Sequence, residues 1–172
     1  MTPEAPADRV AAMLRDHLRA EAEQGRITLL GSTGPAFDVL VPSDWKETVA
    51  ATLEVGERSL RAEAFFLRAP EESDGAAYRV VLERNLRPGP WRFAASDTGD
   101  VWLVADVPLE AVDAEAVDRL LGGLATLTDE TYKPYFRRAF ATSLAEQVAR
   151  GGPGLDAPPP WASDARSMPR GR

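Results

Sequence analysis

The sequence contains 172 residues, which is enough for one domain of ordinary size and too few for two domains with separate cores. Hydrophobic residues make up 44% and charged residues 27%, as in folded soluble proteins, and the net charge of −7 disfavours nonspecific binding to nucleic acid or anionic membranes. With no cysteine and one histidine, the chain lacks the residues for disulfides, thiolate metal sites and most catalytic bases. We therefore expect a cytoplasmic protein with no catalytic, cofactor-binding or metal site and no nucleic-acid or membrane partner.

The first 67 residues predict one helix followed by three strands. Apolar residues recur at helical spacing before Gly25: Val10, Met13, Leu14 and Leu18. Three later segments alternate between apolar and polar residues and predict an antiparallel meander: residues 36–41, 48–55 and 60–67. Between the helix and these strands, residues 31–34 lack the lysine of a phosphate-binding loop and predict a flexible turn.

The rest of the chain predicts a helix, a hairpin and two more helices. Residues 76–86 return to helical spacing, and residues 91–95 and 101–107 flank a turn at Asp97–Asp100. Turn formation is the preferred role of the acids there over calcium binding, because too few oxygen ligands are present. Two final helices are expected at residues 112–127 and 129–148, the second bent near Pro134.

These elements predict an α+β domain in the order α-β-β-β-α-β-β-α-α. Sequential hairpins favour a five-stranded antiparallel sheet with helices packed on one face. The composition changes at Gly151, where glycine, proline and small polar residues replace the apolar pattern. The sequence therefore predicts one domain over residues 1–150 and a disordered tail over residues 151–172.

A group of mixed apolar and polar motifs lies between Arg61 and Leu124: Glu63 to Pro70, Tyr78 with Leu82 to Leu86, Phe93-Ala94, Gly99 to Val104, Val107 to Leu109 and Asp118 to Gly122. Together these motifs resemble the YbjN-like family of bacterial regulators, in its actinobacterial form. The resemblance implies a fold similar to that of type III secretion chaperones and supplies no catalytic residues. Trp102, at a position where tyrosine is commoner, and the break at Pro88-Gly89-Pro90 depart from the family pattern.

The expected function is a non-enzymatic regulatory or chaperone-like module that binds a protein segment through its sheet. The alternative is a small-molecule sensor with a pocket between sheet and helices. A polar groove is predicted on the outward face of the sheet from Arg61, Glu63 and Arg92, with a simple ion pair as the competing interpretation.

Large aromatic residues in the second hairpin and the last helix predict a partner surface or a two-fold dimer interface. The candidates are Trp91, Phe93, Trp102, Tyr132 and Phe136. The competing interpretation is that the last helix folds back and buries its aromatic residues in the monomer.

Two further polar residues receive structural predictions. Asn85 falls on the apolar face of its helix, so its amide is expected to bond to backbone of an adjacent loop or strand. His17 lies at the margin of the first apolar stripe and is interpreted as a helix-edge residue, not as a catalytic base.

Overall fold

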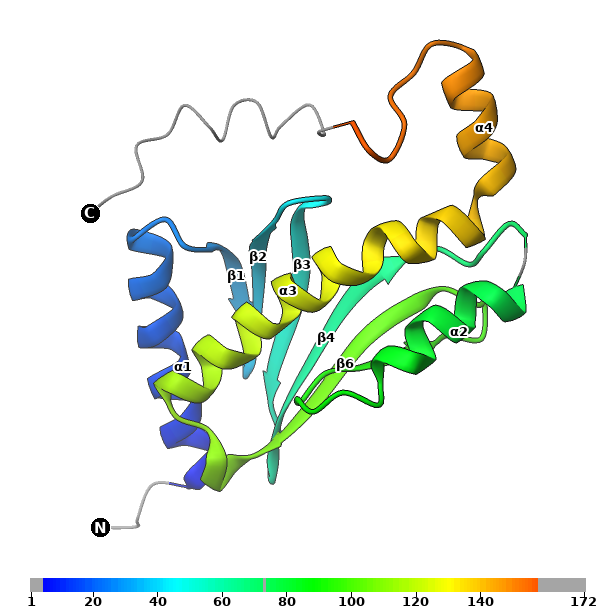
Figure 1. Cartoon of the computed structure of the whole chain (residues 1–172). Helices are drawn as coiled ribbons and strands as arrows, with labels where there is room; N and C mark the ends of the chain where they lie inside the picture. Colours follow the sequence, from blue (N-terminus) through cyan, green and yellow to red (C-terminus); the bar gives the residue numbers. More distant parts are fainter. Residues whose placement is uncertain (1–4, 73, 158–172) are drawn as a thin grey trace.

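The computed structural model describes residues 5–72 and 74–157, and it shows a sheet with helices packed against it (Figure 1). The elements in chain order are α1 (Pro6–Glu23), β1 (Thr28–Thr33), β2 (Ala36–Ser43), β3 (Glu47–Val55), β4 (Ser59–Leu67), α2 (Asp74–Arg84), β5 (Arg92–Ala95), β6 (Val101–Pro108), the 3-10 turn η1 (Leu109–Ala111), α3 (Ala114–Ala139) and α4 (Ala141–Ala149).

The sheet is antiparallel throughout, and its strand order is β1-β2-β3-β4-β6-β5. This arrangement confirms the α+β class but has six strands, so the prediction of five was wrong. The additional strand is β1, which includes residues 31–33 of the segment 31–34 that was expected to form a flexible turn, while Gly34 does lie in a turn. Because β1 is an edge strand, exposed along most of its length and bulged between Leu29 and Gly31, it lacks the alternating apolar pattern that marks the other strands.

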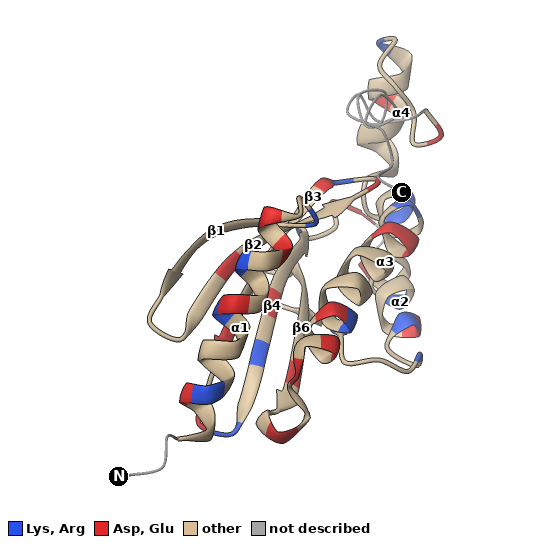
Figure 2. Ribbon diagram, turned by 90° about the vertical axis from the view of Figure 1, so that its left-hand side faces the viewer, with Lys and Arg blue, Asp and Glu red and all other residues tan. Residues whose placement is uncertain are grey.

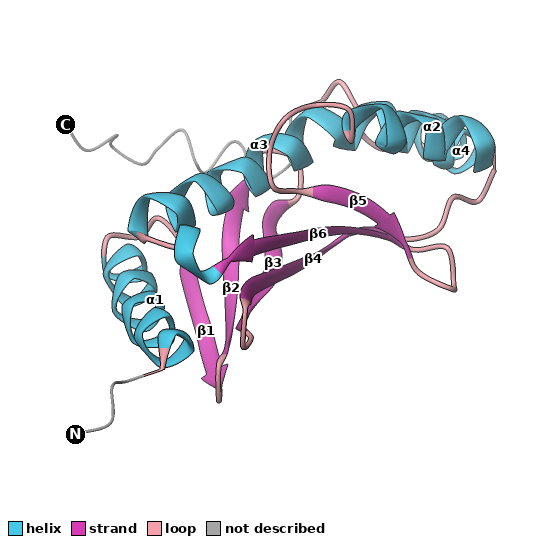
Figure 3. Cartoon of the chain, turned by 90° about the horizontal axis from the view of Figure 1, so that it is seen from below, coloured by secondary structure: helices cyan, strands magenta, loops and turns pink. Residues whose placement is uncertain are grey.

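The helices cover one face of the sheet and leave the other uncovered (Figure 3). Along β3 the inward residues Val49, Leu53 and Val55 are at most 5% exposed, whereas their neighbours Thr52 and Glu54 are exposed. The covered face packs against buried residues of α1 and α3, among them Leu14, Leu18, Leu120 and Leu124. The molecule therefore has one core, between the sheet and its helices.

The prediction of two helices that divide near residue 128 was wrong. α3 runs unbroken from Ala114 to Ala139, with Pro134 inside it, and Phe140 separates it from α4. A proline in a helix leaves the carbonyl of the residue four positions earlier without its donor. Here that carbonyl belongs to Glu130, and Arg84 Nη2 of α2 donates to it at 3.3 Å. A buried stripe from Val117 to Ala139 also continues past the proline.

Asn85 confirms its predicted structural role. Its Nδ2 donates to Phe93 O at 3.1 Å, and its Oδ1 accepts from Phe93 N at 2.7 Å. The two bonds attach the end of the α2 segment to β5, so both polar groups of a partly buried amide are satisfied.

The predicted tail lies partly outside the described residues. Residues 151–157 follow α4 and turn back toward α3, where Asp156 pairs with Arg137 at 2.7 Å and with Lys133 at 4.0 Å. Residues 158–172, the rest of the predicted tail, lie outside the described part of the chain. None of the described helices is both long enough and apolar enough to cross a membrane.

Candidate binding groove on the open face

The uncovered side of the sheet, called here the open face, carries the outward side chains in two rows that cross the strands. The strand register aligns Asp38, Thr52, Glu63, Val104 and Arg92 into one row, the polar row. A second row, the apolar row, lies two residues away from the polar row on each strand. It is formed by Leu40, Ala50, Phe65, Trp102 and Ala94. Because cross-strand neighbours lie about 5 Å apart, the polar row is a continuous surface. In the apolar row, Ala50 and Phe65 lie just beyond the last β3–β4 pair, Ala51 with Ala64.

A shallow groove of about 630 Å³, the open-face groove, spans both rows and touches five strands. Its side chains come from β1, β2, β3, β4 and β6, and its lining is Leu30, Gly31, Ser32, Thr33, Asp38, Val39, Ala50, Ala51, Thr52, Glu63, Phe65 and Trp102. The lining contains two carboxylates and no lysine or arginine. In Figure 2, acidic and basic positions are interspersed over the sheet and helices, so this acidic lining is a local property.

The apolar row presents aromatic surface at the groove. Phe65 and Trp102 face each other across β4 and β6, with ring centroids 5.4 Å apart and an interplanar angle of 77°. Phe65 is 38% exposed, and Leu30 of the edge strand is 59% exposed. Exposed aromatic and apolar side chains grouped in a groove are typical of a surface that binds another molecule.

The polar row holds its side chains by hydrogen bonds along the sheet. Thr52 Oγ1 donates to Asp38 Oδ1 at 2.7 Å, and Arg61 Nη2 pairs with Glu63 Oε1 at 2.8 Å. Arg92 shares the face with these residues but donates to the carbonyls of Gly89 and Trp91. The structure thus joins Arg61 and Glu63 in an ion pair and places Arg92 at the end of the polar row.

Lys46, in the β2–β3 turn, lies at the aromatic end of the groove. Pairing between β3 and β4 stops at Ala51 and Ala64, and beyond that point Lys46 Nζ donates to Phe65 O at 3.2 Å and to Phe66 O. The same ammonium lies 5.3 Å from the centroid of the Phe65 ring. Burial lowers the pKa of Lys46 to about 8. These contacts hold the end of β4, and therefore Phe65, in place.

Two of the five residues predicted to form an aromatic partner surface are buried, so the prediction was wrong for them. Trp91 and Phe93 are 4% and 5% exposed, and Trp91 Nε1 donates to Leu120 O at 2.8 Å, so both belong to the core. Tyr132 and Phe136 stack on α3 with centroids 5.6 Å apart and remain partly buried. Only Trp102 of the five lies in the open-face groove.

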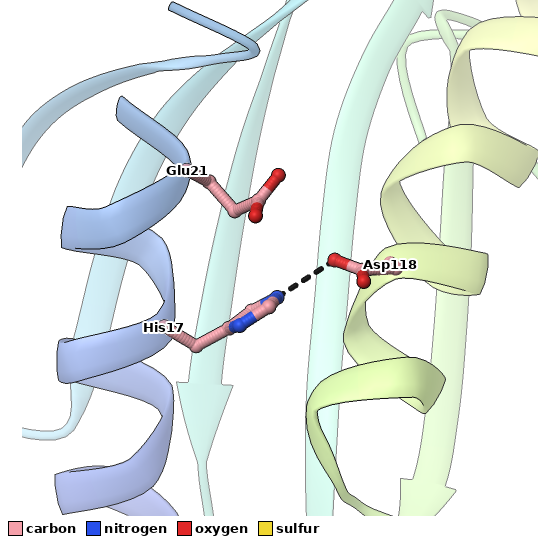
Figure 4. A group of neighbouring side chains, drawn as sticks. All are labelled: His17, Glu21 and Asp118. Carbon is pink, nitrogen blue, oxygen red and sulfur yellow. Dashed lines mark hydrogen bonds and ion pairs between the residues drawn. The ribbon is translucent and has the colours of Figure 1, made fainter. Parts of the chain in front are cut away.

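A separate cluster joins α1 to α3 (Figure 4). His17 Nε2 lies 2.7 Å from Asp118 Oδ1, and Glu21, one turn further along α1, completes a group whose possible ligand atoms lie within 4.8 Å of one another. Arg26 contacts both carboxylate oxygens of Glu21 and, through that hydrogen bond, lowers the pKa of its carboxyl. The spacing of His17 and Glu21 is visible in the sequence, but nothing there identifies the partner on α3.

This cluster is an ion-pair network in which each side chain already has a partner. His17 is engaged by Asp118, and the Glu21 carboxylate is engaged at both oxygens by a guanidinium. A metal ion would have to displace Arg26 to use Glu21. We therefore assign the network to the attachment of α1 to α3.

Comparison with known proteins places the chain among bacterial relatives. Residues 6–136 match the YbjN family, described as "Putative bacterial sensory transduction regulator". An uncharacterized protein of Mycobacterium tuberculosis is 35% identical over 117 residues, which are 68% of this chain and 64% of that protein. An uncharacterized protein of Mycobacterium leprae is 29% identical over 117 residues, 66% of this chain and 64% of that protein. The chain therefore spans about 64% of the length of these relatives.

Among solved structures, the heterodimeric complex ExoU–SpcU from the type III secretion system of Pseudomonas aeruginosa contains a chain that aligns with a TM-score of 0.45 and 19% identity. The alignment covers 55% of this chain and 81% of that chain. The family match covers most of the sequence and confirms the resemblance found in its motifs. The chain belongs to the YbjN family.

Proposed function

We propose that this chain is a non-enzymatic regulatory or chaperone-like module that binds a protein segment in the open-face groove. The observation that carries the proposal is the Phe65–Trp102 pair, which lies on the uncovered face beside the carboxylates of Asp38 and Glu63. Aromatic side chains supply much of the binding energy at protein interfaces, because they bury large apolar areas with few rotatable bonds.

The two rows define the chemistry of the partner. An extended segment lying across the strands would place apolar side chains over Phe65 and Trp102 and basic side chains beside Asp38 and Glu63. The net charge of −7 favours the approach of a basic segment and disfavours an acidic one. The partner is therefore a protein segment that combines arginine or lysine with aromatic or large aliphatic residues.

Two observations support binding over catalysis. The family description refers to regulation. The one histidine of the chain is bonded to Asp118 in the α1–α3 network and does not line the open-face groove. A general base needs a nucleophile or substrate within hydrogen-bond reach, and His17 is committed to another partner.

Capture of partners from native lysate with matched variants tests the proposal. Wild-type protein is compared with Phe65→Ala/Trp102→Ala and with Leu86→Ala, a control that removes an apolar side chain that is 87% exposed beyond α2. Proteins bound through the groove are retained by wild type and by Leu86→Ala and lost by the double variant. Equal recovery with all three proteins would contradict the proposal.

A second candidate function, small-molecule sensing, rests on a different hollow. A cavity of about 1030 Å³ lies between the first half of α1, the start of β4 and η1, with Val10, Met13, Leu109 and Val112 among its apolar lining. Saturable thermal stabilisation by a metabolite, lost in Met13→Glu and kept in Phe65→Ala/Trp102→Ala, would favour this function over protein binding.

A further inference from the structure

We propose that the C-terminal segment of residues 158–172 binds in the open-face groove and competes there with the partner segment. This inference rests on the proposed function, because it assigns the same groove a built-in competitor. The segment has the sequence Pro-Pro-Pro-Trp-Ala-Ser-Asp-Ala-Arg-Ser-Met-Pro-Arg-Gly-Arg. It combines the two side-chain types that the groove selects, a large aromatic residue and arginines.

Charge is the first argument for this occupant. The segment carries one acid, Asp164, and three arginines, Arg166, Arg170 and Arg172, for a net charge of +2, which leaves −9 for residues 1–157. The charged residues of the groove lining are Asp38 and Glu63, and Arg61 pairs with Glu63 from outside the lining. A short basic segment tethered to an acidic body is attracted to an acidic accessible groove, and the tether raises the local concentration of the segment.

The position where the described chain ends is the second argument. Asp156 is held by Arg137 and Lys133 of α3, and Lys133 Nζ lies 3.5 Å from the centroid of the Trp45 ring. Trp45 precedes Lys46, whose ammonium lies over Phe65 at the aromatic end of the groove. This chain of contacts places Asp156, two residues before the segment begins, near the end of the sheet where Phe65 lies.

Length allows the segment to cover the groove. Fifteen extended residues span up to about 50 Å. The five strands that line the groove are separated by four spacings of about 4.8 Å, or about 19 Å in all. Trp161, only four residues beyond Ala157, would enter at the aromatic end, with the arginines further along toward the carboxylates.

Two other hollows fit this segment less well. The hollow between α1 and η1 includes Asp113 and Ala114 at the start of α3, some 35 Å along that helix from Arg137 at 1.5 Å per residue. The hollow beside Trp91 is lined by Arg84 and Arg87 with the single acid Glu130, so it repels a basic segment. Position therefore disfavours the first hollow and charge disfavours the second, whereas the open-face groove meets both conditions.

A spin label on the full chain tests the contact directly. The sequence has no cysteine, so Ser163→Cys creates a single attachment point for a nitroxide and leaves Trp161 intact. The proposal predicts strong paramagnetic broadening of the amide signals of Thr52, Glu63, Phe65 and Trp102 and none at Arg58 or Leu109. A mixture of spin-labelled protein at natural isotope abundance and isotopically enriched protein without a spin label separates contact within one chain from contact between two copies.

Matched variants and salt complete the test. Trp161→Ala in the Ser163→Cys chain removes the broadening at the groove, and added salt weakens it because the contact is partly ionic. Broadening that is spread evenly, or that centres on Arg58 and Leu109, overturns the proposal. Broadening that appears only in the mixed sample also overturns it, because the segment then binds a second copy instead of its own chain.

The partner assay distinguishes failure of this inference from failure of the proposed function. If the segment competes for the groove, full-length Trp161→Ala captures more partner than wild type. The expected increase equals the factor by which the bound segment lowers the apparent affinity of wild type for the partner. If Phe65→Ala/Trp102→Ala loses the partner but a label at position 163 broadens no groove signals, the inference about the C-terminal segment is refuted and the proposed function stands. If the label does broaden the groove signals but the double variant captures as much partner as wild type, the proposed function is refuted and the inference about the segment stands.

Discussion

The two faces of the sheet use neighbouring residues of the same strands for different purposes. Phe66 points to the covered face, is fully buried, and lies 5.1 Å from Phe93 and 5.7 Å from Tyr135, measured between ring centroids. Phe65 points to the open face, is 38% exposed, and has Trp102 and Lys46 as its ring neighbours. A side chain that is surrounded by the core stabilises the fold, whereas one left at the surface beside another aromatic ring is available to a partner.

The largest expected effect comes from substituting Phe66, with the same substitution at Phe65 as the control. Phe66→Ala removes a ring from the core and should lower the free energy of unfolding by about 3–5 kcal/mol. Phe65→Ala, the matched control, should cost about 1 kcal/mol or less because much of its ring already faces water. Urea denaturation of both variants measures the difference, and similar losses would mean that the two faces are not distinct.

A smaller loss of stability is expected where α2 attaches to β5. Asn85→Ala leaves Phe93 N and Phe93 O without their side-chain partners, which should cost about 1–3 kcal/mol. Asn85→Asp keeps the acceptor for Phe93 N and places an oxygen against Phe93 O, so it should recover only part of the loss. An Asn85→Ala variant as stable as wild type would show that water replaces both bonds.

Stability at alkaline pH provides a further test at the border between the two faces. Burial lowers the pKa of Lys46 to about 8, below the ordinary lysine value of 10.5, so the unfolded chain binds the proton more tightly than the folded chain. Stability should therefore rise from pH 8 to about 10.5 relative to Lys46→Met, which cannot titrate. A constant difference between the two proteins over this range would show that the carbonyl bonds and the Phe65 ring offset the cost of burial.

The smallest expected effect concerns the network between α1 and α3. Because Arg26 already occupies both oxygens of Glu21, EDTA and added Zn²⁺ should each leave the melting temperature unchanged. A clear rise with Zn²⁺ that disappears in His17→Ala would instead identify the network as a metal site.

The sequence predicted the middle of the sheet better than its edge. Residues 48–55 and 60–67 alternate because one side of each strand is buried, and this pattern correctly predicted β3 and β4. The edge strand β1 buries little, so its residues carry no such signal. Where Pro134 lies inside α3, Arg84 donates to Glu130 O, a contact between residues 46 positions apart that no local pattern reveals.

For the candidate groove, the sequence indicated polar and aromatic residues but not the face on which each lies. Arg61 and Glu63 were predicted on the outward face of their strand, where the structure places them. Trp91 precedes the four-residue strand β5, too short for alternation to show that it and Phe93 enter the core. Phe65 was not identified as a site residue, because its role depends on its alignment with Trp102 across β4 and β6.

Side-chain footprinting with hydroxyl radicals tests most directly whether the open face binds the partner. Aromatic and methionine side chains in three regions report separately: Phe65 and Trp102 on the open face, Met13 in the hollow beside α1, and Tyr132 with Phe136 on α3. With the captured partner bound to Trp161→Ala protein, in which the C-terminal segment does not occupy the groove, oxidation of Phe65 and Trp102 should fall while that of Met13, Tyr132 and Phe136 stays at the level of the free variant. Protection confined to Met13, or to Tyr132 and Phe136, would contradict the assignment of the open face as the binding surface.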